Sequence, residues 1–143
     1  MAAYFEDVEV GDGFQTGSYV VDADEIVEFG RKYDPQPMHT DPEAATDTMF
    51  GGLVASGWHT GAITMRLLVE DYFPETRALG AAGIDEVRFP NPVRPGDELS
   101  AHGEVIGTEG WDDARGLVRS RVITETDEEP VLSMVGRVLW ERE

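Results

Sequence analysis

Two side chains that can exchange protons, Asp34 and His39, lie five residues apart in a proline-rich segment. A carboxylate and an imidazole are common partners in general acid–base catalysis. Pro35 disfavours the helical region for Asp34, and Pro37 does the same for Gln36, so we predict a non-helical backbone between the pair. An extended chain of this length would hold the side chains roughly 16 Å apart, whereas a folded-back loop would bring them within hydrogen-bonding distance. The spacing leaves both arrangements open.

A glycine-rich stretch over Met49–Thr60 follows the pair, with Gly57 at the start of an apolar segment. The first backbone N–H groups of a helix have no acceptor inside the helix, so a helix that begins here presents free donors. Such donors suit an oxyanion or a phosphate group. The segment from Tyr33 to Thr60 is therefore the candidate functional region.

Helices are predicted on both sides of the proline-rich segment. Asp22 is the expected N-cap of a helix over Ala23–Tyr33, with Glu25 as its capping-box partner. Asp41 is the expected cap of a short helix that begins at Pro42. These helices hold the candidate pair between them.

The longest predicted helix covers Gly57–Tyr72 and ends before Pro74. It has little polar face, so we expect it to be buried on most sides. Alternating apolar residues predict one strand before the helices and four strands after the long one. Their expected ranges are Phe14–Val21, Ile84–Phe89, Leu99–Val105, Gly116–Thr126 and Leu132–Trp140.

This order of elements predicts an α+β fold, with an antiparallel sheet wrapped around the long helix. A single sheet of this kind has two edges, and edge strands are prone to pair with another chain. We therefore expect a homodimer or a higher homo-oligomer.

Three segments together resemble the MaoC-like (R)-specific enoyl-CoA hydratases and acyl dehydratases. Asp34-Pro35-Gln36-Pro37-Met38-His39 resembles their Asp-x-Asn/Gln-Pro-x-His signature, and Ala55–Thr60 resembles the segment that opens their central helix. Val87–Leu99 resembles their strand–turn–strand. This chain departs from relatives at Ser56-Gly57, where they carry His-Gly, and at Met65, where some carry serine.

The resemblance implies a single hot-dog domain over residues 1–143. It also implies reversible addition of water to a trans-2-enoyl-CoA thioester, which gives an (R)-3-hydroxyacyl-CoA. The catalytic residues that it implies are Asp34 as base, His39 as its partner and the Gly57 N–H as oxyanion donor. No cofactor is expected beyond the coenzyme A of the substrate.

Six further residues are candidates for substrate binding: Gln36, Ser56, Trp58, His59, Arg88 and Arg94. Gln36 either orients His39 or bridges the loop backbone. His59 either lines the pocket or packs at the helix start or a subunit contact. Arg88 and Arg94 are candidates for phosphate contacts, although surface arginines often have no such role. The three histidines are scattered without metal-ligand spacing, so no metal site is expected.

Two other functions stay open on the same fold. An acyl-CoA thioesterase would use a carboxylate-activated water without needing the paired histidine. A non-catalytic acyl-CoA-binding subunit would keep both pocket and fold. The fold alone does not separate these functions, because chemistry belongs to the site.

The chain is strongly acidic: 29 acidic residues stand against 11 basic ones, Lys32 is the only lysine, and the net charge is −18. This charge argues against nucleic acid or an anionic membrane as partner. Dispersed acidity with one lysine predicts adaptation to high salt, although an ordinary acidic enzyme is the alternative. At molar salt the Debye length is about 3 Å, so the charge would not exclude a coenzyme A ester.

The chain length of 143 residues predicts one domain, and 41% hydrophobic residues is typical of a globular protein. The chain has no cysteine, which excludes disulfides and thiol chemistry. No apolar run reaches membrane-spanning length, and the N-terminus lacks the basic and apolar regions of a signal peptide. A cytoplasmic location is therefore expected.

Overall fold

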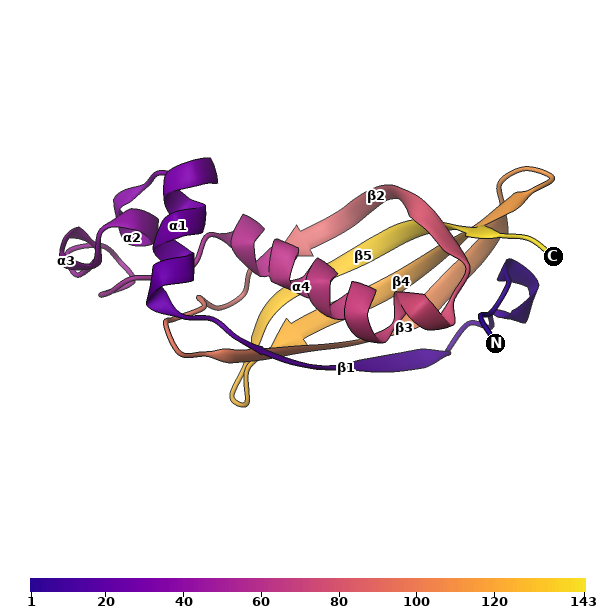
Figure 1. The fold of residues 1–143 in the computed structure, drawn as a ribbon, viewed down its shortest axis with the longest axis horizontal. Coiled ribbons are helices and arrows are strands. Elements are labelled where there is room, and N and C mark those ends of the chain that lie inside the picture. Colours follow the sequence, from indigo (N-terminus) through magenta and orange to yellow (C-terminus); the bar gives the residue numbers. More distant parts are fainter.

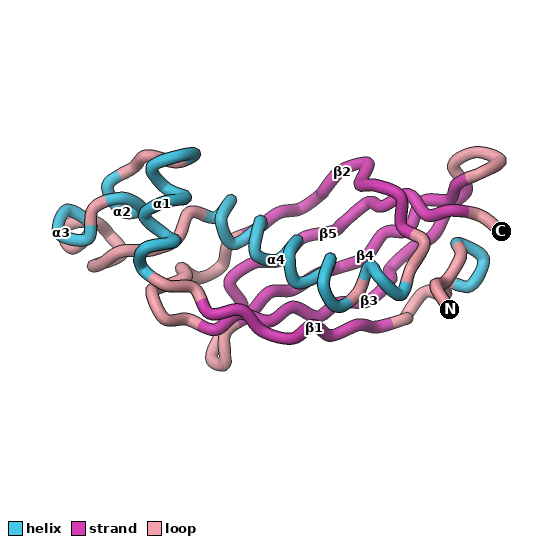
Figure 2. The backbone as a smooth tube through the Cα atoms, viewed as in Figure 1, coloured by secondary structure: helices cyan, strands magenta, loops and turns pink.

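The computed structural model describes all residues, 1–143, as one antiparallel sheet curved around one long helix (Figures 1 and 2). The sheet order is β1-β3-β4-β5-β2. Its strands are β1 (Gly13–Val20), β2 (Ala78–Arg88), β3 (Glu98–Gly110), β4 (Arg115–Glu125) and β5 (Pro130–Glu141). The predicted α+β architecture is confirmed, and β1 and β2 are the two edges.

The long helix α4 (Gly57–Asp71) crosses the inner face of the sheet between the two edge strands (Figure 1). Three shorter helices gather beyond its N-terminal end: α1 (Ala23–Tyr33), α2 (Pro37–Thr40) and α3 (Pro42–Ala45). Single 3₁₀ turns occupy Phe5–Asp7 and Phe73–Glu75. Both chain termini lie at the opposite end of the molecule, so the candidate segment is away from them.

The bounds of α1 agree with the prediction because the local signals are strong. The Asp22 side chain accepts a hydrogen bond from the Glu25 N–H, and Ile26 and Gly30 face the interior. The expected capping box is wrong, however. The Glu25 carboxylate bonds to Tyr19 and His59 instead of turning back to the Asp22 backbone.

The prediction that no helix occurs between Asp34 and His39 is also wrong, because His39 lies in the four-residue helix α2. Pro37 restricts the residue before it: Gln36, the N-cap of α2, is extended, with φ −102° and ψ 150°. Pro37 then takes the first helical position. A backbone N–H there would have no acceptor within the helix, so no hydrogen bond is lost because proline lacks one. The backbone therefore turns sharply between α1 and α2.

Gly30 allows α2 to lie directly against α1. A Cβ at this position would overlap the carbonyl oxygen of His39 and lie 2.9 Å from the His39 Cβ. The close approach of the two helices thus requires a residue without a side chain. It also sets the position of His39.

The helix α4 is buried on one face only, which corrects the expectation of burial on most sides. Ile63, Leu67 and Leu68 are buried in the core, whereas Met65 and Val69 are exposed. The reason is that a single sheet covers one side of the helix. The other side carries an apolar stripe that the chain itself leaves uncovered.

Candidate active site

Asp34 and His39 are brought together by the turn between α1 and α2. Asp34 is the C-cap of α1, with its N–H donating to Gly30 O at 2.8 Å. His39 is the third residue of α2 and is 8% exposed. The distance from Asp34 Oδ2 to His39 Nε2 is 3.4 Å. Of the two arrangements that the sequence left open, the folded-back one is observed.

The tautomer of His39 follows from its second contact. Nδ1 of His39 lies 2.7 Å from the carbonyl oxygen of Val54. A carbonyl only accepts, so Nδ1 carries the hydrogen, and in the neutral ring Nε2 presents its lone pair to Asp34. Two acceptors then face each other, and a water molecule can donate one hydrogen to each. The arrangement can therefore hold a water molecule from which one of the two groups can accept a proton.

The Asp34 carboxylate has two further donors. Gln36 Nε2 donates to Oδ1 at 2.6 Å, and Ser56 Oγ donates to Oδ2 at 2.8 Å. Burial raises the pKa of Asp34, but the hydrogen bonds from Gln36 and Ser56 lower it by more, and a positive charge on a protonated His39 lowers it further. The pKa therefore lies below its ordinary value of 3.8, and the group is an oriented carboxylate at neutral pH.

The four residues from Val54 to Gly57 contact every part of the site. The Val54 carbonyl fixes His39, and the Ser56 hydroxyl, which is 1% exposed, fixes Asp34. Ser56 is also the N-cap of α4 and accepts from the Trp58 N–H at 3.3 Å. Gly57 is the first residue of that helix, so its N–H has no intrahelical acceptor.

His39 and Gly57 line one cavity of about 420 Å³. The other lining residues are mostly apolar: Met38, Met49, Phe50, Val54, Ala55, Thr60, Phe89, Pro90, Asn91, Pro92, Val93 and Val131. The Phe89 ring packs against the start of α4, where a Cβ on Gly57 would lie 2.6 Å from it. A larger residue at Gly57 would therefore displace the cavity wall.

Three other predicted binding residues do not line this cavity but contact Asp34 or residues of the cavity wall. Gln36 bonds to Asp34 and not to His39. Trp58 is 68% exposed and meets Phe89 edge-on, with 6.5 Å between ring centroids. Arg94 donates to the carbonyl of Phe50 at 2.9 Å, which places it at the rim.

Arg88 is exposed at the end of β2, directly before Phe89. Neither Arg88 nor Arg94 forms an ion pair with a carboxylate of the chain. Both guanidinium groups therefore have no carboxylate partner, and the Arg94 group lies at the cavity rim through its contact with Phe50.

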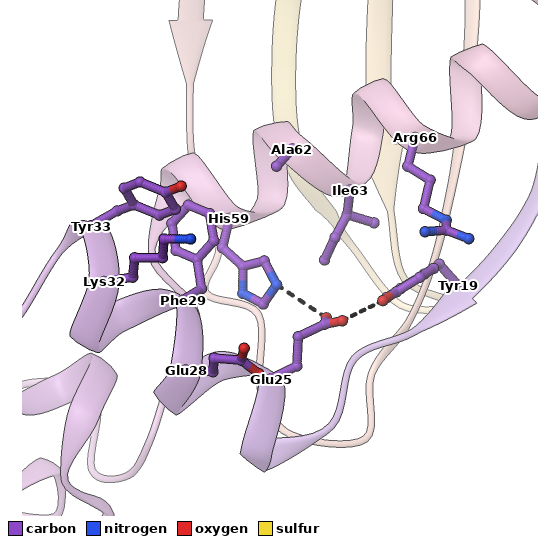
Figure 3. Close-up of a pocket in the computed structure, with 10 residues that line it drawn as sticks. All are labelled: Tyr19, Glu25, Glu28, Phe29, Lys32, Tyr33, His59, Ala62, Ile63 and Arg66. Atoms are coloured by element: carbon purple, nitrogen blue, oxygen red, sulfur yellow. Dashed lines mark hydrogen bonds and ion pairs between the residues drawn. The ribbon is translucent and has the colours of Figure 1, made fainter.

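His59 lies in a second cavity of about 360 Å³, between α1 and α4 (Figure 3). Its Nε2 is 3.0 Å from Glu25 Oε2, and the other oxygen of Glu25 accepts from Tyr19. The His59 ring stacks on Phe29 at 4.7 Å. Burial lowers the pKa of His59 below its ordinary value of 6.5, although Glu25 opposes the shift. His59 therefore lines a different cavity from the one that His39 and Gly57 line.

Sequence reasoning missed two parts of the site. Val54 contributes a backbone carbonyl, and no side-chain pattern identifies such a group. Phe89 was visible only as part of the strand–turn–strand segment, yet it forms the wall next to Gly57. Within the chain, no three His, Cys, Asp or Glu residues cluster as metal ligands would. None of its helices is long and apolar enough to span a bilayer.

An antiparallel sheet wrapped around a long central helix defines a hot-dog protein, and here an Asp–His pair lies at the start of that helix. Residues 7–127 match the family model of the MaoC like domain, and the chain belongs to this family.

Three proteins illustrate the similarity. A crystal structure of the MaoC-like dehydratase from Rhodospirillum rubrum is 40% identical, with a TM-score of 0.93 over 99% of each chain. The uncharacterized protein YdeM of Bacillus subtilis is 36% identical over 71% of this chain and 72% of its own. The 3-hydroxyacyl-thioester dehydratase Z of Mycobacterium tuberculosis is 35% identical over 67% of this chain, and the match spans 63% of that protein.

Proposed function

We propose that the protein is an (R)-specific hydratase that interconverts trans-2-enoyl-CoA and (R)-3-hydroxyacyl-CoA thioesters. The observation that carries this proposal is the Asp34–His39 pair at 3.4 Å, with the His39 tautomer fixed, beside the free N–H of Gly57. The similarity to a 3-hydroxyacyl-thioester dehydratase supports it, because dehydration is the same reaction run in reverse.

In the hydration direction, Asp34 accepts a proton from a water held between its Oδ2 and His39 Nε2. The water oxygen forms a bond to C3 of the substrate, and the C2–C3 double bond opens. A proton returns from the Asp34–His39 pair to C2, so the pair ends the cycle as it began. We assign Asp34 as the base and His39 as the partner that aligns the water and shares the proton transfer.

Negative charge develops on the thioester oxygen as the double bond opens. We assign the Gly57 N–H as the donor to this oxygen, since it is at a helix start and lines the same cavity as His39. The loss of one such donor typically costs about 3 kcal/mol of transition-state stabilisation. This chemistry needs no cofactor beyond the coenzyme A that the substrate brings.

For the coenzyme, we propose that Arg88 and Arg94 contact its phosphates. Both are exposed near the cavity and have no carboxylate partner. Trp58 offers an exposed ring to the thioester arm beside Phe89. Gln36 and Ser56 act through their hydrogen bonds to Asp34. For His59, a substrate contact stays a prediction without support from its position.

We also propose that the protein works as a homodimer. Edge strand β2 carries the exposed side chains of Leu79 and Ile84, and the uncovered stripe of α4 carries Met65 and Val69. A second copy would cover this apolar surface and pair the open edge of the sheet.

The test is turnover of crotonyl-CoA, followed by loss of the enone absorbance and by release of free thiol. A hydratase consumes the enone without releasing thiol, whereas a thioesterase releases thiol. A binding subunit does neither, although it still binds the thioester. Thiol release by the wild-type protein at the rate of enone loss would overturn the proposal.

A further inference from the structure

Thr60 stands out among the buried hydroxyl groups of the chain. Its side chain is 2% exposed and borders the cavity that His39 and Gly57 line, and its hydroxyl forms no hydrogen bond within the chain. The other buried hydroxyls have partners in the chain: those of Thr16, Ser56, Thr64, Ser120 and Thr124. The fully enclosed side-chain atoms without a partner are His59 Nδ1 and Arg77 Nε, so the Thr60 hydroxyl is not sealed inside the protein. Because polar groups at such sites are nearly always hydrogen-bonded, a water or a ligand in the cavity is its natural partner.

The place of Thr60 in the helix indicates what that partner is. Thr60 and Gly57 are three residues apart in α4 and line the same cavity. Residues with this spacing share a helix face, about 4.5 Å apart along the axis. Side chains of a helix tilt towards its N-terminus, so the Thr60 hydroxyl leans towards the turn that contains Gly57. The hydroxyl and the Gly57 N–H are therefore close neighbours on one wall.

We propose that the Thr60 hydroxyl is a second donor to the thioester oxygen of the substrate, beside the Gly57 N–H. This inference rests on the proposed function. An oxyanion gains most from two donors, because each supplies one short hydrogen bond as charge develops. The backbone of Thr60 is occupied otherwise: its N–H donates to Ser56 O at 3.1 Å and its carbonyl accepts from Thr64. Only the hydroxyl is free for this role.

The experiment compares Thr60→Val, which keeps the shape and removes the hydroxyl, with Thr60→Ser, which keeps the hydroxyl. With crotonyl-CoA, Thr60→Val should lose roughly 100-fold in kcat and raise KM by no more than about fivefold, as expected for a donor that acts mainly in the transition state. Thr60→Ser should retain most of the wild-type kcat. The melting temperature of Thr60→Val should be unchanged or higher, since its hydroxyl has no partner to lose in the free protein.

Thr64→Val is the matched control one turn further along α4. Its hydroxyl bonds to Thr60 O at 2.9 Å and to Thr124 Oγ1 at 2.6 Å, and it does not line the cavity. This variant should lower the melting temperature and keep kcat. A Thr60→Val protein that melts lower but turns over normally would show a structural hydroxyl and overturn the inference.

Binding of butyryl-CoA, a saturated thioester that cannot be hydrated, separates the inference from the proposed function. The loss of one neutral hydrogen bond in Thr60→Val should weaken its binding about fivefold by calorimetry. If the wild type binds but does not hydrate crotonyl-CoA, the proposed reaction fails while this binding difference still tests Thr60. Equal binding and equal turnover in the two proteins would overturn the role of Thr60, and no binding by the wild type would overturn both.

Discussion

Asp34 gains its chemical character from the groups around it. Gln36 and Ser56 donate to its two oxygens, and His39 faces it across 3.4 Å. The two hydrogen bonds from Gln36 and Ser56 keep the carboxylate charged and fix its orientation. The Val54 carbonyl does the same for His39 by holding the hydrogen on Nδ1. The pair therefore behaves as one unit and not as two separate side chains.

This arrangement predicts that Asp34→Asn and His39→Ala each lower kcat by about 10²–10⁴-fold, the usual worth of general acid–base catalysis. Groups that share one water are non-additive, so the double variant should be little worse than either single one. Asp41→Asn is the control, because Asp41 caps α3 through the N–H groups of Glu43 and Ala44 and asparagine caps equally well. A folded Asp34→Asn protein with near-normal hydration would contradict the assignment.

His59 predicts a pH effect on stability. Burial lowers the pKa of His59 in the folded protein. In the unfolded chain the pKa has its ordinary value of 6.5, so as the pH falls below 6.5 the unfolded chain binds the proton more readily than the folded one. The free energy of unfolding should therefore fall as the pH drops from above 6.5 towards the folded pKa, despite the ion pair with Glu25. Urea unfolding between pH 5 and 8 checks this, and His59→Gln should flatten that part of the curve. An equal slope in both proteins would rule out His59 as the source.

The geometry of the site depends on how closely helices α1 and α2 approach each other. Gly30 of α1 lies against the backbone of His39 in α2, and no side chain fits between them. The segment from Val54 to Gly57 then connects both helices to the start of α4. Three helices thus converge on the two side chains that we propose as catalytic.

Gly30→Ala should therefore push α2 away and lower both stability and turnover. Overpacking of this kind typically costs about 1–3 kcal/mol, and the displacement of His39 should lower kcat as well. Gly61→Ala is the matched control, since a Cβ there meets no atom within 4 Å and alanine favours a helix interior by roughly 0.5–1 kcal/mol. Thermal unfolding and crotonyl-CoA turnover measure both variants. Equal behaviour would mean that the helix contact is not tight.

Negative charge is the dominant feature of the protein as a whole. Only five arginines form ion pairs with carboxylates, so most of the 29 acidic side chains have no cationic partner. Their mutual repulsion is nearly unscreened in dilute buffer, where the Debye length reaches about 30 Å, and short-ranged at molar salt. The stability of the folded state should therefore depend on the salt concentration.

We predict that the melting temperature and the activity fall steadily as potassium chloride is diluted from molar to about 10 mM. Unfolding curves at constant pH across this range are the measurement. Stability that does not change with salt would mean that the acidity is no adaptation to high salt.

The uncovered stripe of α4 predicts a homodimer in which this face is buried. Val69→Glu should therefore yield monomers in light scattering at high salt, because a charge in an apolar interface is costly. Val10→Glu makes the same change at an exposed site in the turn before β1 and should leave the dimer intact. A wild-type protein that is monomeric, folded and active would contradict the prediction.

Elements that depend on local signals could be predicted from the amino-acid sequence. Asp22 and the apolar spacing after it defined α1, and period-two alternation indicated the strands that surround α4. The prolines beside Asp34 and His39 identified the candidate pair. These signals act between residues a few positions apart, so they can be read from the chain.

The hydrogen bonds that orient this pair come from long-range contacts, which could not be predicted from the sequence. His39 bonds to Val54, fifteen residues away, Asp34 to Ser56, twenty-two away, and Glu25 to His59, thirty-four away. The helix α2 forms because Gly30 lets it pack, although four residues rarely form a helix alone. Contacts of this kind depend on where the fold brings distant segments, and no local preference of the chain encodes them.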